Sequence, residues 1–152
     1  MPIFVLRLIV LSVGLFALAT AELSAQQADS AQIAWHEDAH EAVRVARAQR
    51  RPLLVYVTSA HCGHCRTMER QTWKDESVIR SVSGRYVALK LSSERHPAAI
   101  EQLKVQAFPT TIVLTADIKV HEGAVGMLTP EEAIRLLTRG PAVVAHNNVN
   151  RQ

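Results

Sequence analysis

The sequence predicts an α/β domain in which a central mixed sheet of about four strands is flanked by helices on both faces. Helical periodicity and short β-branched apolar runs alternate along the chain, which is typical of this class. The first two strands are separated by helices, which favours a parallel pair, and the last two are joined by a tight turn, which predicts a hairpin. The expected order is helix, strand, helix, strand, helix, hairpin and helix.

The individual elements follow from local signals. Ala39, Val43 and Ala46 recur at helical spacing, so we expect the first helix over 35–50, and PLLVYVTS after it predicts a strand buried on both faces. The next predicted elements are a helix from the cysteine motif to about Thr72, a helical piece DESVIRSV that ends before Gly84, and a strand YVALKLS. They are followed by a helix HPAAIEQLK, with Pro97 in its first turn, and by strands TTIVLTA and KVHEG, joined near Asp117. The last predicted helix is TPEEAIRLLTR, with Thr129 as N-cap, Glu132 in a capping box and Gly140 as the stop.

The N-terminal residues carry an apolar run, Leu8 to Ala21, which is short for a membrane span of about 20 residues and is followed by small residues. We expect 1–25 to be a secretory signal peptide, with an uncleaved N-terminal anchor in the membrane as the alternative. Either segment places the domain in the periplasm or another extracytoplasmic space. We expect 26–34 to be a tether, 35–140 the domain and 141–152 a flexible tail.

Composition restricts the classes of partner. The 152 residues are 48% hydrophobic and 20% charged with a net charge of +3, which is ordinary for one globular domain. The densest basic cluster, Arg44 to Arg51, has no interleaved aromatic residues, which favours a solvated helix face over nucleic-acid binding. We expect a monomer that binds no nucleic acid.

The stretch TSAHCGHCRTMER contains both cysteines, Cys62 and Cys65. Between a buried strand and a helix, backbone N–H groups and the helix dipole would stabilise a thiolate at Cys62, so we expect Cys62 to be the nucleophile. Cys65 lies one turn inside the helix and can resolve a mixed disulfide. His64 can add a positive charge or a hydrogen bond beside the thiolate. The site would need no cofactor beyond its own redox-active disulfide.

The pattern of CGHC after an apolar strand with FPTT about forty residues later resembles the thioredoxin superfamily. Together with RPLLVYVTSAHCGHCRTMERQTWKDESVI and VGMLTPEEAIRLL, it is most similar to the exported thioredoxin-like domains related to disulfide-reductase proteins of bacterial envelopes. The resemblance implies a thiol-disulfide oxidoreductase that acts on protein thiols and disulfides. It also implies an external electron donor or acceptor, for which a membrane oxidoreductase is a candidate; the direction of electron flow stays open.

The resemblance also assigns further site residues. It implies that Pro109 is a cis-proline beside the disulfide, which fits the low cost of a cis bond before proline, and that the Phe108 backbone pairs with an extended substrate. Lys90 matches a strand lysine behind the active site, although a residue at the sheet edge is an equal interpretation. The remaining substrate-binding residues that the resemblance implies are His61, Gly63, Thr110 and Gly126.

Two positions depart from the family pattern. His61 replaces the usual tryptophan before the first cysteine, and Tyr56 replaces a buried acid that normally helps the second cysteine lose its proton. The proton acceptor for Cys65 is therefore unassigned. The CGHC tetrapeptide is the one seen in protein disulfide isomerase, whose potential is about −180 mV against about −270 mV for thioredoxin. We therefore predict a potential above that of thioredoxin.

Two alternatives concern metals and binding without turnover. His61, Cys62, His64 and Cys65 could bind zinc or copper, but consecutive ligands in one turn rarely close a tetrahedral shell, so we expect no metal site. HEDAH, 36–40, matches a metalloprotease motif, but its position on a polar helix face favours a solvated surface. The alternative function is a redox-dependent or metal-binding module that holds a partner without turnover.

Overall fold

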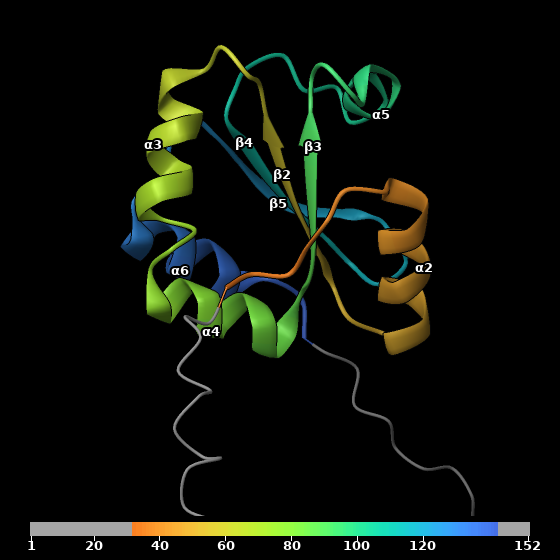
Figure 1. The fold of residues 1–152 in the computed structure, drawn as a ribbon. Helices are drawn as coiled ribbons and strands as arrows, with labels where there is room; N and C mark the ends of the chain where they lie inside the picture. The colour runs from red at the N-terminus through yellow and green to blue at the C-terminus, as the bar shows by residue number, and fades with distance from the viewer. Residues whose placement is uncertain (1–31, 143–152) are drawn as a thin grey trace, which may run out of the picture. The chain divides into compact units, whose positions relative to one another are not determined.

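A mixed sheet of five strands forms the centre of the computed structural model, which describes residues 32–142 (Figure 1). The sheet confirms the predicted class, with one short strand more than expected. Parallel pairs join β1 to β3 and β3 to β2, and antiparallel pairs join β2 to β4 and β4 to β5. In spatial order the strands are β1 (Trp35–His36), β3 (Val87–Ser92), β2 (Leu53–Thr58), β4 (Thr110–Leu114) and β5 (Val120–Val125).

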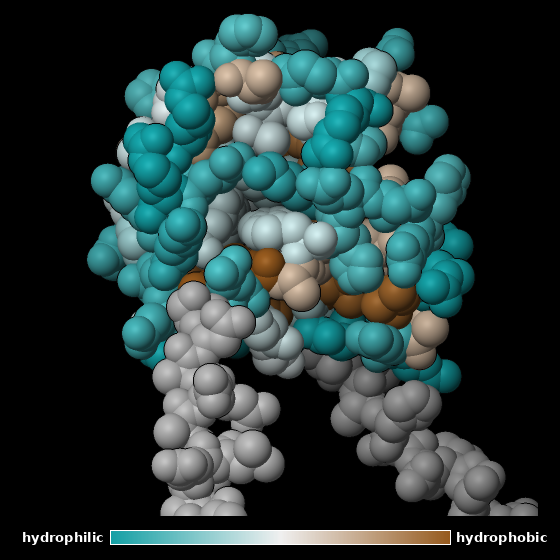
Figure 2. Space-filling model, in the orientation of Figure 1, coloured by the Kyte–Doolittle hydropathy of each residue, from teal (hydrophilic) through white to brown (hydrophobic). Residues whose placement is uncertain are grey.

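Helices cover both faces of this sheet (Figure 1), and hydrophilic residues make up most of the surface seen in the same orientation (Figure 2). Strand residues alternate between two apolar clusters, because successive side chains of a strand point to opposite faces: Val55 packs into one cluster, and Leu54 and Tyr56 into the other. The first cluster is covered by α2 (Ala39–Gln49) and α5 (Pro97–Gln102), and the second by α3 (Gly63–Gln71), α4 (Glu76–Arg85) and α6 (Pro130–Arg139).

The first helix is shorter than predicted, because Trp35 and His36 form strand β1 instead of its first turn. Trp35 pairs with Ala88 of β3, and its ring centroid lies 5.9 Å from that of Tyr56. Asp38 then starts α2 as its N-cap, since its side chain accepts a hydrogen bond from Glu41 N at 2.8 Å. The prediction of a helix over 35–50 was therefore wrong at its N-terminal end.

The predicted end of α4 before Gly84 was also wrong, because the helix continues through Gly84 to Arg85. Its apolar face is buried by Val78, Ile79 and Val82, and this packing outweighs the weak helix propensity of one glycine. The helix ends at Tyr86, whose hydroxyl donates a hydrogen bond of 2.6 Å to the carbonyl of Leu137 in α6.

A capping box fixes the last helix of the domain, and core packing fixes its first residues. The capping box of α6 is confirmed, since the Thr129 side chain accepts from Glu132 N and the Glu132 carboxylate accepts from Thr129 N. Ile33, which the sequence placed in the tether, is buried in the core. The predicted signal peptide, residues 26–31 of the predicted tether and 143–152 lie outside the described residues. Within 32–142, no helix has both the length and the apolarity to span a bilayer.

Candidate active site

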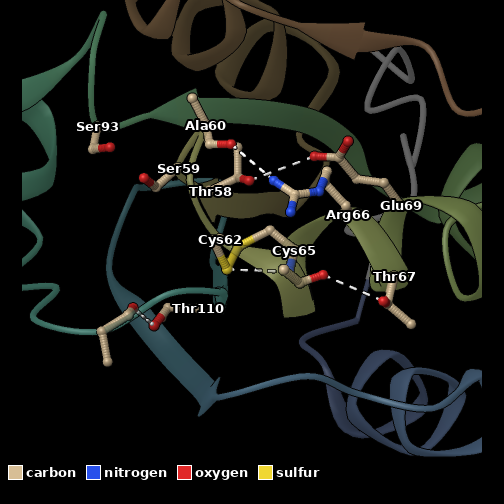
Figure 3. The surroundings of a disulfide bond; sticks show 12 residues. Thr58, Ser59, Ala60, Cys62, Cys65, Arg66, Thr67, Glu69, Ser93 and Thr110 are labelled. Carbon is tan, nitrogen blue, oxygen red and sulfur yellow. Dashed lines mark hydrogen bonds between the residues drawn. A yellow bond between two sulfur atoms is a disulfide. The ribbon is translucent and has the colours of Figure 1, made fainter.

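The two cysteines lie where β2 gives way to α3, and a disulfide joins them (Figure 3). Cys62 is the N-cap of α3 with extended backbone angles, and its Sγ accepts a hydrogen bond from Cys65 N at 3.1 Å. Cys62 is half-buried, whereas Cys65 is only 1% exposed. The accessible sulfur is therefore the one that also faces a backbone N–H and the positive end of the helix dipole.

Sheet register brings the proline loop to the same edge. Val57 near the end of β2 pairs with Thr110 at the start of β4, and Thr110 pairs with Val125 at the end of β5. The Phe108-Pro109 bond is cis, as predicted, and Pro109 is buried. The predicted site residues of the β4 and β5 ends are thus neighbours of the loop that carries Cys62.

Further hydrogen bonds hold the loop that carries Pro109. Gly126 has a φ of 99°, which favours glycine, and its N–H donates to the carbonyl of Pro109 at 2.8 Å. Thr110 Oγ1 donates to the carbonyl of Ala107 at 2.7 Å (Figure 3). The carbonyl of Pro109 is therefore engaged within the protein.

The remaining predicted site residues surround the disulfide. His61, Gly63 and His64 are exposed on the loop and the first turn of α3. The carbonyl of Gly63 accepts a hydrogen bond from Thr67 Oγ1 at 3.2 Å, which holds that first turn (Figure 3). The two histidines are thus accessible to a protein that approaches Cys62.

Beneath the disulfide, Tyr56 occupies the position where the resemblance implies a buried acid. Its hydroxyl donates to the carbonyl of Cys65 at 3.2 Å. Burial raises the pKa of Tyr56 to about 12, so its phenol is protonated at neutral pH and cannot replace a carboxylate as a proton acceptor. Tyr56 instead packs within an aromatic cluster, where its ring centroid lies 5.4 Å from that of Trp73.

A carboxylate does lie nearby, on a residue that sequence reasoning missed. Glu69 follows Cys65 by one helical turn, and its Oε1 lies 2.9 Å from Lys90 Nζ; Thr58 Oγ1 donates to the same oxygen at 3.5 Å. Lys90 pairs directly with Tyr56 of β2, whereas β1, on the other side of β3, pairs only with Ala88 and Leu89. The spacing of four residues from Cys65 was the available signal for Glu69.

Neither metal motif gains support within the described part of the chain. His36 lies in β1 and His40 in α2, so the two histidines of HEDAH do not share a helix face. Across 32–142, no three or more His, Cys, Asp or Glu side chains are placed together so as to hold a metal ion.

Taken together, the fold and the Cys62–Cys65 pair define a thiol-disulfide redox protein. A family model described as thioredoxin-like matches residues 34–116, more than half of the chain. The chain belongs to this family, and it is a thioredoxin-like oxidoreductase with a CxxC redox pair.

Two curated relatives are similar in sequence. Thioredoxin-related protein DsbJ of Chlamydia pneumoniae is 27% identical over 119 residues, which cover 78% of this chain and 32% of DsbJ. Thioredoxin-like protein slr1139 of Synechocystis sp. is 30% identical over 81 residues, which cover 52% of this chain and 72% of the relative. The chain therefore spans about a third of the length of DsbJ.

Solved structures show the same fold. Thioredoxin from Thermus thermophilus has a TM-score of 0.64 at 23% identity, covering 72% of this chain and 86% of its own. The DsbH oxidoreductase has a TM-score of 0.63 at 15% identity, covering 81% and 96% respectively. The C-terminal domain of DsbD from Neisseria meningitidis has a TM-score of 0.59 at 15% identity, covering 71% and 100%. At these identities the likeness establishes the fold.

Proposed function

We propose that the chain is an extracytoplasmic thiol-disulfide oxidoreductase for protein substrates, in which Cys62 attacks and Cys65 resolves. The observation that carries the proposal is the N-cap position of Cys62, whose Sγ accepts the N–H of Cys65 at 3.1 Å. That donor and the helix dipole stabilise the thiolate more than the thiol, which lowers the pKa of an attacking cysteine. The burial of Cys65 keeps it for the internal step.

In the reducing direction, the Cys62 thiolate attacks one sulfur of a substrate disulfide. A mixed disulfide forms, and the other substrate sulfur leaves as a thiolate and takes a proton. Cys65 then loses its proton, and its Sγ attacks Cys62 Sγ. The internal disulfide forms, the substrate sulfur is released, and the substrate has gained two electrons. An external dithiol must return those electrons, and the reverse sequence oxidises a substrate dithiol.

A protein substrate is supported by the surface beside the cis-proline. Val125 and Met127 flank Gly126 and are 72% and 40% exposed. Apolar side chains exposed beside the cis-proline can contact an extended substrate chain. Pairing of that chain with the Phe108 backbone, and contacts with His61, Gly63, Thr110 and Gly126, belong to the same proposal.

The location outside the cytoplasm is supported by the apolar run Leu8 to Ala21 and the small residues after it. Expression of the full chain in a bacterium, followed by fractionation, tests this location. The proposal requires the protein in the periplasmic fraction or on the outer side of the inner membrane. A mass shortened by about 25 residues would identify a cleaved signal peptide.

The chemical proposal is tested by two single variants of the same pair. Cys62→Ser should abolish reduction of insulin disulfides, because no attacking thiol remains. Cys65→Ala should instead accumulate covalent mixed disulfides that dithiothreitol releases. Trapped electron donors alone would indicate a reductase, and trapped folding clients alone an oxidase or isomerase. A wild-type chain that binds a partner but turns over neither insulin nor scrambled ribonuclease would contradict the enzyme and favour a binding module.

A further inference from the structure

The loop between β2 and α3 is held on both sides of one residue by charged side chains. Ala60 N donates a hydrogen bond of 3.0 Å to Glu94 Oε1, and the carbonyl of Ala60 accepts one of 3.1 Å from the Arg66 guanidinium. Figure 3 shows Arg66 reaching back from α3 to Ala60. Ala60 precedes Cys62 by two positions, so its backbone determines where the attacking cysteine lies.

Glu94 is well suited to hold this loop. The same Oε1 accepts hydrogen bonds from Ser59 Oγ at 3.1 Å and from Ser93 Oγ at 2.8 Å. The Ala60 N–H, and after it the Ser93 hydroxyl, lower the pKa of Glu94 to about 2. The carboxylate is therefore ionised at every pH at which thiol exchange proceeds, and its bonds to the loop are charge-assisted.

The other charges around the loop are already paired. Lys90 pairs with Glu69 at 2.9 Å, and Arg95 pairs with Glu37 at 2.7 Å. Glu69, Lys90, Arg95 and Glu94 line an open cavity of about 390 Å³ together with Ser59 and Ala60 of the loop. Because each charged lining group has a protein partner, the arrangement is suited to fixing the loop rather than to binding a ligand.

We propose that Glu94 is a positioning residue for Cys62, acting through the N–H of Ala60. With Ala60 fixed, the turn closes through the bond from Cys62 N to the carbonyl of Ser59 at 3.2 Å. That turn leaves Cys62 Sγ where it accepts the N–H of Cys65. Arg66 holds the next peptide, through the carbonyl of Ala60. This inference rests on the proposed function, in which Cys62 is the attacking thiol.

Two variants of Glu94 separate position from charge. Glu94→Gln loses the charge but keeps an oxygen that can accept from Ala60 N, whereas Glu94→Ala loses both. Because both variants lack the charge, the difference between them isolates the held loop. Glu101→Ala is the matched control, since Glu101 is an exposed carboxylate of α5 for which the described residues provide no side-chain hydrogen bond or ion pair.

The measurements are the pH profile of Cys62 alkylation in the reduced full-length chain, and kcat/KM for insulin reduction. We expect Glu94→Ala to raise the Cys62 pKa above that of Glu94→Gln, because a displaced Sγ loses its N–H donor. We expect its kcat/KM to fall about ten-fold relative to Glu94→Gln. Glu101→Ala should match the wild type in both. Combining Glu94→Ala with Arg66→Ala should cost less than the sum of the two single losses, because both act through Ala60.

Three outcomes would overturn the inference. Equal pKa values and rates in the two Glu94 variants would show that the held loop has no effect on Cys62. A lower melting temperature of Glu94→Ala with an unchanged Cys62 pKa would show a purely structural role. Additive losses in the double variant would show that the two residues act separately. A wild type without turnover would instead count against the proposed function, and the Cys62 pKa would still test the role of Glu94.

Discussion

Glu69 and Lys90 form an ion pair behind the redox pair, with 2.9 Å between Glu69 Oε1 and Lys90 Nζ. Glu69 lies one turn beyond Cys65 on α3, and Lys90 pairs across the sheet with Tyr56, whose hydroxyl contacts the carbonyl of Cys65. Both side chains are partly accessible, at 35% and 27% exposure, so water can reach the pair. A carboxylate from α3 thus lies on the side of the redox pair where the resemblance implied an acid at the position of Tyr56.

From this arrangement we predict that Glu69 receives the proton of Cys65 during resolution of the mixed disulfide. Glu69→Gln removes the acceptor while preserving size, so the mixed disulfide should persist at least about ten-fold longer at neutral pH. Quenched-flow measurement of its decay, with a labelled substrate, gives this lifetime.

Glu76→Gln is the matched control for Glu69→Gln. Glu76 is an exposed carboxylate of α4 that also forms an ion pair, with Arg80 at 3.4 Å, but it lies on another helix. We expect its decay rate to equal that of the wild type. Equal rates in all three proteins would leave solvent as the proton acceptor and reject Glu69.

Tyr56→Phe should reveal the buried phenol through the pH dependence of stability. At neutral pH the variant loses the hydrogen bond to the Cys65 carbonyl, which costs about 1 kcal/mol. The folded chain holds the Tyr56 proton up to about pH 12, whereas an unfolded tyrosine loses it near 10.0. The stability that the protonated Tyr56 phenol gives to the folded state is therefore complete below pH 10, and it is lost as the pH rises toward about 12.

Urea denaturation of the wild type and Tyr56→Phe across this range provides the test. Phenylalanine has no proton to lose. The stability advantage of the wild type over Tyr56→Phe should therefore fall by about 2 kcal/mol between pH 10 and about 12, and so change sign. Tyr86 is present in both proteins and cancels. A difference that stays constant from pH 8 to 12 would mean that Tyr56 is not held protonated by burial.

The fold was predictable because its signals are local. The capping box at Thr129 and Glu132 fixes the start of α6, and an uninterrupted apolar run identifies β2 as a central strand. Strand β1 was missed because a strand of two residues has no periodicity of its own. Its pairing with β3 depends on Trp35 packing against Tyr56 and Trp73, which are distant in sequence.

The candidate site also has residues that local sequence predicts and residues that only the fold reveals. Cys62, Cys65 and the cis bond before Pro109 could be predicted, because the chemistry of a cysteine pair and of an X-Pro bond is visible in a few adjacent letters. The partners of Glu69 and Glu94 could not, because an exposed glutamate looks like any other until the fold brings Lys90 or Ala60 to it. Sequence spacing identifies the reacting groups, and tertiary contacts identify those that hold them.

Gly140→Ala should destabilise the domain through a steric contact. A Cβ at this position would collide with the Tyr86 hydroxyl, which is committed to the Leu137 carbonyl. The φ of −59° at Gly140 suits alanine, so the backbone itself is not the obstacle. We expect a loss of about 1 to 3 kcal/mol in the free energy of unfolding by urea.

Gly84→Ala provides the opposite expectation in the same assay. Gly84 lies inside α4, and a Cβ there meets nothing within 4 Å, so alanine should stabilise the helix by up to about 1 kcal/mol. The two substitutions add the same methyl group. A neutral Gly140→Ala beside a stabilising Gly84→Ala would show that Tyr86 can move aside without cost.

The redox potential is expected to lie above the value of about −270 mV for thioredoxin. His64 is exposed in the first turn of α3, two residues after the N-cap Cys62, and a positive charge or an N–H near that sulfur would stabilise the thiolate and therefore the reduced form. His64→Ala should lower the potential by tens of millivolts in a glutathione titration, since 30 mV corresponds to about 1.4 kcal/mol. His40→Ala, in the first turn of α2, removes an exposed histidine elsewhere and should leave the potential unchanged. A wild-type potential at or below that of thioredoxin, or equal shifts in the two variants, would contradict this role for His64.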